Sequence, residues 1–127
     1  MANTFHLPLH VQREVHGLAI VVRAAGNLDQ DTVPALRLEL RTALAMATPP
    51  FPVVVDLSEI TFFGSAGLNE LLKHQRRARE ARIPLRIAAS HRAVLRTITA
   101  SGLDQVLELY PDVEQALHAA RSARSAG

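Results

Sequence analysis

The sequence predicts an α/β fold: a five-stranded mixed sheet with an antiparallel strand at its N-terminal edge and about four helices packed against it. Strand-like segments alternate with helical patterns after two consecutive strands at the start of the chain. Residues 53–55 are a β-branched run without polar alternation, which is typical of a strand buried on both faces of a parallel sheet. Residues 5–15 alternate between apolar and polar side chains and contain Pro8, which favours an edge strand.

The length of 127 residues fits one domain with a real hydrophobic core. We expect a single domain over residues 1–127, ordered from about residue 5 to residue 120. Residues 121–127 have no side chain apolar enough to anchor them, so we expect a flexible tail there. Aromatic residues make up only 4% of the chain, so the core is expected to consist mainly of Leu, Val, Ile and Ala.

The composition excludes several classes of function. Cysteine is absent, which removes disulfides, thiol catalysis and cysteine-type zinc sites. Neither a signal peptide nor an apolar stretch of roughly 20 residues is present, so we expect a soluble cytoplasmic protein without membrane insertion. A net charge of +2 is too small to indicate nucleic-acid binding. His6 and His10 share a strand face but lie about 13 Å apart at ~3.3 Å per residue, so neither a metal nor a cofactor is expected.

The first half of the chain predicts a hairpin followed by a helix. Residues 5–15 pair with residues 18–25, and residues 26–29 form a loop. Asp31 or Thr32 then caps a helix. Its buried stripe is expected to comprise Val33, Leu36, Leu40, Leu44 and Ala47.

The central strand is expected to end at Asp56, and residues 56–63 are expected to form a loop that leads to Gly64. Ser65 suits the N-cap position of the next helix, where its hydroxyl would accept a backbone hydrogen bond. This helix should continue to about Arg82, with basic residues near its C-terminus that complement the helix dipole. Ser65 is therefore expected to be exposed at the carboxyl edge of the sheet.

The last third of the chain predicts two more strand and helix pairs. Residues 85–89 form a strand, and Ser90 caps a helix that ends at Gly102 in a left-handed conformation. Residues 106–109 form a short final strand, and Asp112 begins the last helix in a capping box.

A serine between two glycines invites a comparison with hydrolases, but the nucleophile elbow requires G-x-S-x-G and Phe63 occupies the first glycine position. The pair Gly64 and Gly67 also lacks the lysine of a phosphate-binding loop. We therefore expect a protein without enzymatic activity. From spacing alone, Ser65 is explained by an N-cap worth about 1 kcal/mol.

Residues 56–72, DLSEITFFGSAGLNELL, resemble the signature of STAS domains, the family of bacterial anti-sigma factor antagonists. In that family a strand ending in Asp-Leu-Ser leads through an apolar loop to Asp-Ser-Ser-Gly-Leu. Residues 26–29 resemble the family's Gly-x-Leu-Asp, and residues 101–104 resemble its carboxyl third. The resemblance covers about residues 5–120 and implies a single-domain STAS-like fold.

The resemblance implies that Ser65 is the residue that is phosphorylated. It also implies a partner-binding surface that consists of Asn27, Asp29, Gly64, Ser65, Ala66, Gly67, Leu68 and Asn69. Two positions depart from the family: Gly64 stands where the family usually has Asp, and Ala66 replaces the second Ser. The first change removes a negative charge beside the serine that accepts phosphate. We further expect Asn27 and Asp29 to lie beside Ser65, because both loops follow parallel strands.

By this resemblance the protein is an anti-sigma factor antagonist in a partner-switching pathway, active as a monomer or weak dimer. Its partners would be an anti-sigma factor serine kinase and a serine phosphatase, and phosphorylation of Ser65 would end binding. One alternative is a STAS subunit that is not phosphorylated and serves as a scaffold in a transporter or signalling assembly. Another is a site for a small ligand or nucleotide at the carboxyl edge of the sheet.

Overall fold

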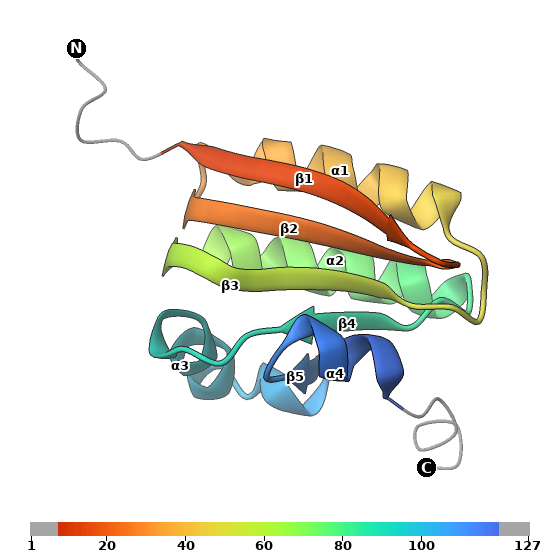
Figure 1. The fold of residues 1–127 in the computed structure, drawn as a ribbon. Coiled ribbons are helices and arrows are strands. Elements are labelled where there is room, and N and C mark those ends of the chain that lie inside the picture. The colour runs from red at the N-terminus through yellow and green to blue at the C-terminus, as the bar shows by residue number, and fades with distance from the viewer. Residues whose placement is uncertain (1–7, 120–127) are drawn as a thin grey trace.

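A computed structural model describes residues 8–119 and confirms the expected order of strands and helices (Figure 1). The elements are β1 (Leu9–His16), β2 (Ala19–Leu28), α1 (Val33–Met46), β3 (Val53–Phe63), α2 (Ser65–Glu80), β4 (Leu85–Ala88), α3 (Arg92–Ala100), the 3-10 helix η2 (Leu103–Gln105), β5 (Glu108–Tyr110) and α4 (Val113–His118). The predictions for residues 5–7, including His6, and for the tail at residues 121–127 lie outside the described residues.

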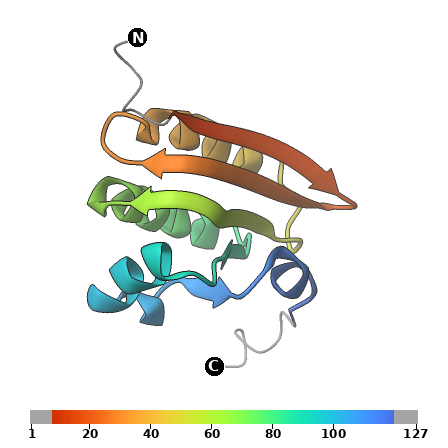
Figure 2. The ribbon, with the colours of Figure 1, turned by 60° about the vertical axis from the view of Figure 1, so that its left-hand side comes forward.

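The sheet has the strand order β1-β2-β3-β4-β5. β1 pairs antiparallel with β2, whereas the other neighbouring strands are parallel, which confirms the mixed sheet with an antiparallel edge strand. α1 and α2 lie behind the sheet in Figure 1, and α4 lies in front of β4 and β5. Figure 2 shows the same layers after a rotation of 60°.

The main core lies between the sheet and helices α1, α2 and α3. It is built from aliphatic side chains, as the low aromatic content predicts, including Val22, Val55, Ile87, Leu40, Leu71 and Ile98. A smaller cluster lies on the opposite face of the sheet, where Ala116 of α4 covers Val21, Val54 and Ala88. Three helices thus cover one face of the sheet, and α4 covers only part of the other.

β3 is longer than expected, because it continues past Asp56 to Phe63. Its pairing with β2 shifts in register twice, between Arg23 and Ala25 and again further along the strand. Such bulges insert an extra residue and redirect the side chains that follow, which lets polar residues remain within a strand. The buried carboxylate of Asp56 supports the first bulge: it accepts from the backbone N–H of Ser58 at 3.0 Å and from Arg23 Nη1 at 2.5 Å.

β2 also continues further than expected, because residues 26–28 form its end rather than a loop. Gly26 has a φ of 113°, and a Cβ added there would lie 2.1 Å from the carbonyl oxygen of Pro8. Only glycine fits both the left-handed backbone and this close approach. β2 therefore reaches Leu28, next to the start of α2.

Thr32 is the N-cap residue of α1, but its side chain does not make the capping bond. The carboxylate of Asp29 accepts instead from the backbone N–H groups of Asp31 at 2.9 Å and Thr32 at 3.1 Å. The predicted inner stripe is confirmed for Val33, Leu36 and Leu40. Leu44 and Ala47 are only half-buried, and Ala43 is the fully buried residue at this end.

The remaining helix ends agree with most predictions. Gly102 has a φ of 79° and is left-handed, as expected. Asp112 is the N-cap of α4, and its carboxylate accepts from the backbone N–H of Gln115 at 2.8 Å. Two boundaries were wrong by one or two residues. The N-cap of α3 is His91 rather than Ser90, and the last strand is Glu108–Tyr110 rather than residues 106–109.

A charged cluster around the buried Glu70 joins α1 to α2. The Glu70 carboxylate accepts from Arg37 of α1 through two N–H groups at 3.2 Å and pairs with His74 Nε2 at 2.9 Å. Burial raises the pKa of Glu70, but the hydrogen bonds from Arg37 and His74 outweigh this effect, so its pKa lies below the ordinary value. Burial lowers the pKa of His74, and the nearby Glu70 only partly opposes this. Both pKa values therefore lie below those of the unfolded chain.

Candidate functional site

Ser65 is exposed and is the first helical residue of α2. The N-cap is Gly64, with an extended backbone at φ −100° and ψ −178° and no side-chain capping bond. The exposure of Ser65 at the start of a helix is confirmed, but a strand rather than the expected loop precedes Gly64, and the assignment of Ser65 as the N-cap is wrong by one position. The Ser65 hydroxyl is therefore not needed to begin the helix.

The start of α2 is held close to the end of β2. The backbone N–H of Gly64 donates to the carbonyl oxygen of Leu28 at 3.1 Å. A Cβ added at Gly67 would lie 2.7 Å from Leu28 Cδ2 and 3.0 Å from Phe63 Cε1. The absence of a side chain at Gly67 thus lets the helix approach the sheet, and this contact fixes the position of Ser65.

A hollow of about 400 Å³ surrounds Ser65 at the carboxyl ends of β2 and β3. It is lined by Asp29, Gln30, Phe62, Gly64, Ser65, Ala66 and Asn69. The structure therefore brings Asp29 to the same hollow as Ser65, as the parallel pairing of β2 and β3 predicts. Five of the eight predicted site residues line this hollow: Asp29, Gly64, Ser65, Ala66 and Asn69.

The other three predicted site residues lie outside the lining of the hollow. Asn27 is half-buried within β2, and its Oδ1 accepts from Thr61 Oγ1 at 2.7 Å, which joins β2 to β3. Gly67 and Leu68 are buried, and Leu68 belongs to the main core. Their observed contacts are internal, so they support the position of the surface rather than form its exposed part.

Phe62 and Gln30 line the hollow but were not among the predicted site residues. The Phe62 side chain is 52% exposed, and its Cε2 would lie 3.0 Å from a Cβ added at Gly64. The second bulge in β3 explains this exposure, because Thr61 and Phe62 both face outward while Phe63 faces the core. Because successive side chains of a strand point to opposite faces, the adjacent Phe62 and Phe63 indicate one inward and one outward ring. The sequence does not tell which of the two rings faces outward.

The electrostatics around Ser65 permit a negative charge on its side chain. The first turn of a helix presents backbone N–H groups and the positive end of the dipole. α2 has no acidic residue in its first turn, and Arg77 and Arg79 lie in its last turn, as the sequence predicts. The Asp29 carboxylate, which already accepts two backbone hydrogen bonds, is the acidic group that lines the hollow.

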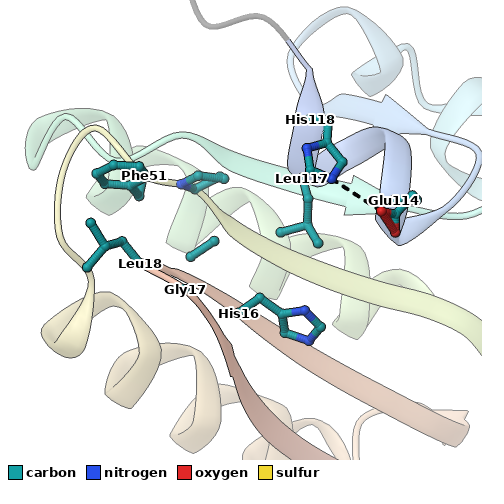
Figure 3. A pocket seen from close by; sticks show the side chains of 9 residues that line it. His16, Gly17, Leu18, Phe51, Glu114, Leu117 and His118 are labelled. Carbon is teal, nitrogen blue, oxygen red and sulfur yellow. Dashed lines mark hydrogen bonds and ion pairs between the residues drawn. The ribbon is translucent and has the colours of Figure 1, made fainter.

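A second hollow of about 480 Å³ lies at the opposite end of the sheet (Figure 3). Its apolar wall includes Leu18, Phe51 and Leu117, and its polar rim includes His16 and the exposed pair Glu114–His118 at 3.2 Å. It lies near the start of β3, whereas the predicted ligand site was at the carboxyl edge. The hollow around Ser65 is therefore the one that matches the predicted site.

Within residues 8–119, no group of three or more His, Asp or Glu side chains is placed to hold a metal ion. Over the same part of the chain, no helix is both long and apolar enough to cross a membrane.

The fold and the site together define a small α/β domain in which an exposed serine begins the helix after the central strand. Residues 11–111 match the family described as "Mlab, STAS domain". The chain therefore belongs to the STAS domain family.

Two similar proteins at 32% identity are anti-sigma factor antagonists, and a third, more distant structure shows the same fold. Anti-sigma-F factor antagonist RsfA of Mycobacterium tuberculosis (strain CDC 1551 / Oshkosh) is 32% identical over 104 residues, which cover 82% of this chain and 81% of RsfA. The crystal structure of an anti-sigma factor antagonist from Mycobacterium paratuberculosis has a TM-score of 0.81 at 32% identity and covers 89% of this chain and 94% of that chain. The structure of Bacillus SpoIIAA in its phosphorylated form has a TM-score of 0.64 at 21% identity. The match covers 84% of this chain and 96% of the SpoIIAA chain. Proteins of this class are regulatory and not enzymes.

Proposed function

We propose that this STAS domain is an anti-sigma factor antagonist that binds an anti-sigma factor through the surface around Ser65. The exposed Ser65 in a hollow beside the half-exposed ring of Phe62 is the observation that carries the proposal. The two mycobacterial antagonists at 32% identity support the choice of an anti-sigma factor as partner.

Phe62 supplies the apolar anchor of this surface. Buried aromatic side chains contribute much of the binding energy at many protein interfaces, whereas polar residues at the rim contribute less. Gln30 and Asn69 are exposed polar residues of the same hollow. A partner that covers the hollow would remove the Phe62 ring and the Ser65 hydroxyl from water together.

Phosphorylation of Ser65 regulates this binding, and the anti-sigma factor is a protein of the serine-kinase type. A phosphate adds a charge of about −1.5 to −2. The backbone N–H groups at the start of α2 stabilise an anion there in the free domain, so the domain stays folded. In the complex the same charge would have to lose its water beside the carboxylate of Asp29. Phosphorylation therefore weakens binding, and a serine phosphatase restores it.

SpoIIAA, which has the same fold, exists in a phosphorylated form. At 21% identity this likeness shows the fold alone, so the regulatory proposal depends on the geometry of Ser65. With Gly64 in place of an acidic residue, the Ser65 hydroxyl is still exposed, but a kinase has no carboxylate beside it to recognise.

The test combines intact mass spectrometry with titration calorimetry. The full chain is incubated with a candidate anti-sigma factor kinase and ATP, and a mass increase of one phosphate is expected for the parent protein but not for Ser65→Ala. Ser65→Ala should bind the partner as the parent does, whereas Ser65→Asp should bind at least about tenfold more weakly, which corresponds to ~1.4 kcal/mol.

Thr48→Asp is the matched control, because Thr48 is exposed and follows α1 at the other end of the sheet. Thr48→Asp adds the same charge outside the hollow, so this variant should bind the anti-sigma factor with the affinity of the parent protein. Equal affinities for the parent and Ser65→Asp would reject the switch and favour the unphosphorylated scaffold.

A second candidate function is a small-ligand or nucleotide site in the same hollow. Its volume of about 400 Å³ and its place at the carboxyl ends of parallel strands favour this alternative. Calorimetric titration of the free domain with nucleotides tests it, and binding that Asn69→Ala removes would support it.

A further inference from the structure

We propose that the free edge of β1 pairs antiparallel with β1 of a second copy of this chain, so that the two sheets join into one. β1 is the edge strand, and within the described residues it pairs only with β2 (Figure 2). An edge strand presents a row of backbone N–H and C=O groups that can pair with another strand. β1 offers eight residues for such pairing.

Geometry leaves few registers for this pairing. Alternate residues of a strand direct their N–H and C=O groups to the same side, so in antiparallel self-pairing even-numbered residues oppose even-numbered ones and odd oppose odd. The two-fold axis therefore passes through a residue. β1 runs from Leu9 to His16, so its centre lies between Gln12 and Arg13. Only a two-fold axis at one of these two residues lets nearly all of β1 pair with the β1 strand of the second copy.

The register centred on Gln12 is self-complementary. On the open face of the sheet it places His10 of each copy opposite Glu14 of the other, where an imidazole N–H can donate to the carboxylate. Glu14 already accepts from His16 and Arg23 of its own chain, and a carboxylate has about four acceptor sites in total. Two such cross-copy contacts would form around the axis.

On the helix-covered face the same register places Leu9 opposite Val15. Val15 is 65% exposed in the single chain and Leu9 is half-buried. Cross-strand apolar pairs of this kind stabilise a sheet by roughly 0.2–1 kcal/mol each. Pairing of the two copies thus buries an apolar side chain that the single chain leaves in water.

The register centred on Arg13 is disfavoured by charge. It would place the two Arg13 side chains, each paired with Glu39 of its own chain, directly opposite each other, and like charges at opposed positions destabilise a sheet. It would also set His10 against His16, in place of the contact between His10 and Glu14. Charge complementarity therefore selects Gln12 as the residue on the axis.

The proposed pairing leaves the Ser65 surface free. Ser65 follows β3, which is separated from the paired edge by β2 and β1. Because the two copies are antiparallel, their β3 strands point in opposite directions and their Ser65 surfaces lie at opposite ends of the joined sheet. The proposed dimer is therefore independent of the proposed function. A protein that does not dimerise could still bind an anti-sigma factor, and a protein that does not bind one could still dimerise.

A charge-swap experiment at Gln12 tests both the dimer and its register, with sedimentation velocity over a concentration series as the measurement. Gln12 is exposed but lies opposite Arg23 of β2, so urea denaturation of each variant is measured alongside to separate a loss of dimer from a loss of fold. Gln12→Lys and Gln12→Glu each place like charges across the axis and should each weaken dimerisation at least about tenfold, or ~1.4 kcal/mol. An equimolar mixture should restore the dimer, because Lys then faces Glu.

The outcomes separate the possibilities. In the register centred on Arg13, Gln12 would oppose Glu14, so Gln12→Lys would strengthen the dimer and Gln12→Glu would weaken it; this result overturns the proposed register. A parent protein that sediments as a monomer throughout the series overturns the dimer itself. Gln105→Lys and Gln105→Glu, at an exposed position in η2, are the matched controls and should behave as the parent.

Discussion

The backbone N–H of Gly64 donates to the carbonyl oxygen of Leu28 at 3.1 Å, which ties the last residue of β2 to the N-cap of α2. Because β2 and β3 are parallel neighbours, this bond brings the segment after β2 against the start of the helix after β3. Asp29 and Ser65 consequently line one hollow although they are far apart in the sequence.

Gly67→Ala should destabilise the fold. The added Cβ would lie 2.7 Å from Cδ2 and 2.8 Å from Cγ of Leu28, which is fully buried and cannot move aside freely. Overpacking of this kind costs about 1–3 kcal/mol, and the better helix propensity of Ala recovers up to ~1 kcal/mol. We therefore expect the free energy of unfolding, measured by urea denaturation, to fall by up to about 2 kcal/mol.

Leu28→Ala provides the control for this explanation. Alone it should cost about 2–5 kcal/mol through the cavity that it leaves. In the double variant the methyl group introduced by Gly67→Ala occupies part of that cavity, so the combined loss should be smaller than the sum of the two single losses. Strictly additive losses would show that Gly67 and Leu28 do not constrain each other.

Gly64→Asp should leave stability nearly unchanged and increase phosphorylation of Ser65. The extended backbone at Gly64 accepts any residue, and the half-exposed Phe62 ring can move away from the new Cβ. An Asp at the N-cap improves on Gly by only a few tenths of a kcal/mol. The added carboxylate restores the charge that STAS domains usually carry beside the serine, so the initial phosphorylation rate, followed by mass spectrometry, should rise.

Gly64→Asn separates charge from capping, because Asn caps a helix about as well as Asp. It should match Gly64→Asp in unfolding free energy but keep the parent's phosphorylation rate. An equal rate increase for both variants would mean that the kinase responds to the conformation of the junction and not to its charge.

Phe62→Ala and Phe63→Ala should have opposite effects. Phe62 is 52% exposed, so its loss should change the unfolding free energy by less than about 0.5 kcal/mol while weakening partner binding by about 1–2 kcal/mol. Phe63 is 4% exposed, so its loss should cost about 3–5 kcal/mol of stability. Calorimetric titration and urea denaturation measure the two quantities. Unchanged affinity for Phe62→Ala would remove this ring from the proposed interface.

Stability should decrease on acidification because of the buried pair Glu70 and His74. The folded state lowers the pKa of His74 from 6.5, so the unfolded chain binds more protons below about that pH and stability is lost as pH falls. The pKa of Glu70 is lowered from 4.5, so its contribution is complete above that pH and is lost at more acidic pH. Both effects have the same sign, and urea denaturation between pH 8 and pH 4 should show a continuous loss.

His74→Gln tests the first part of this loss. Glutamine keeps an N–H donor for Glu70 but does not titrate, so the variant should show a smaller dependence of the unfolding free energy on pH near pH 6. At lower pH the loss due to Glu70 should remain. An unchanged slope near pH 6 would assign the effect to other groups.

The sequence by itself determined the order of the elements, the antiparallel edge strand and the exposed serine at the start of α2. Each of these depends on local rules. Alternation and Pro8 indicate an edge strand, β-branched residues indicate a buried strand, and the glycine and serine before an apolar stripe indicate a helix start. The motif around Ser65 also identified the family, because it is continuous in the sequence.

The tertiary structure alone decided how far β2 and β3 extend and which side chains face outward. Residues 56–62 look like a loop locally, because turn-forming and acidic residues follow the β-branched run, but pairing with β2 and two shifts in register make them part of a strand. Those shifts expose Phe62 and bury Phe63, and no local pattern distinguishes the two rings. The close approach of Gly67 to Leu28 and the hydrogen bond from Gly64 to Leu28 likewise arise from packing between segments that are distant in the sequence.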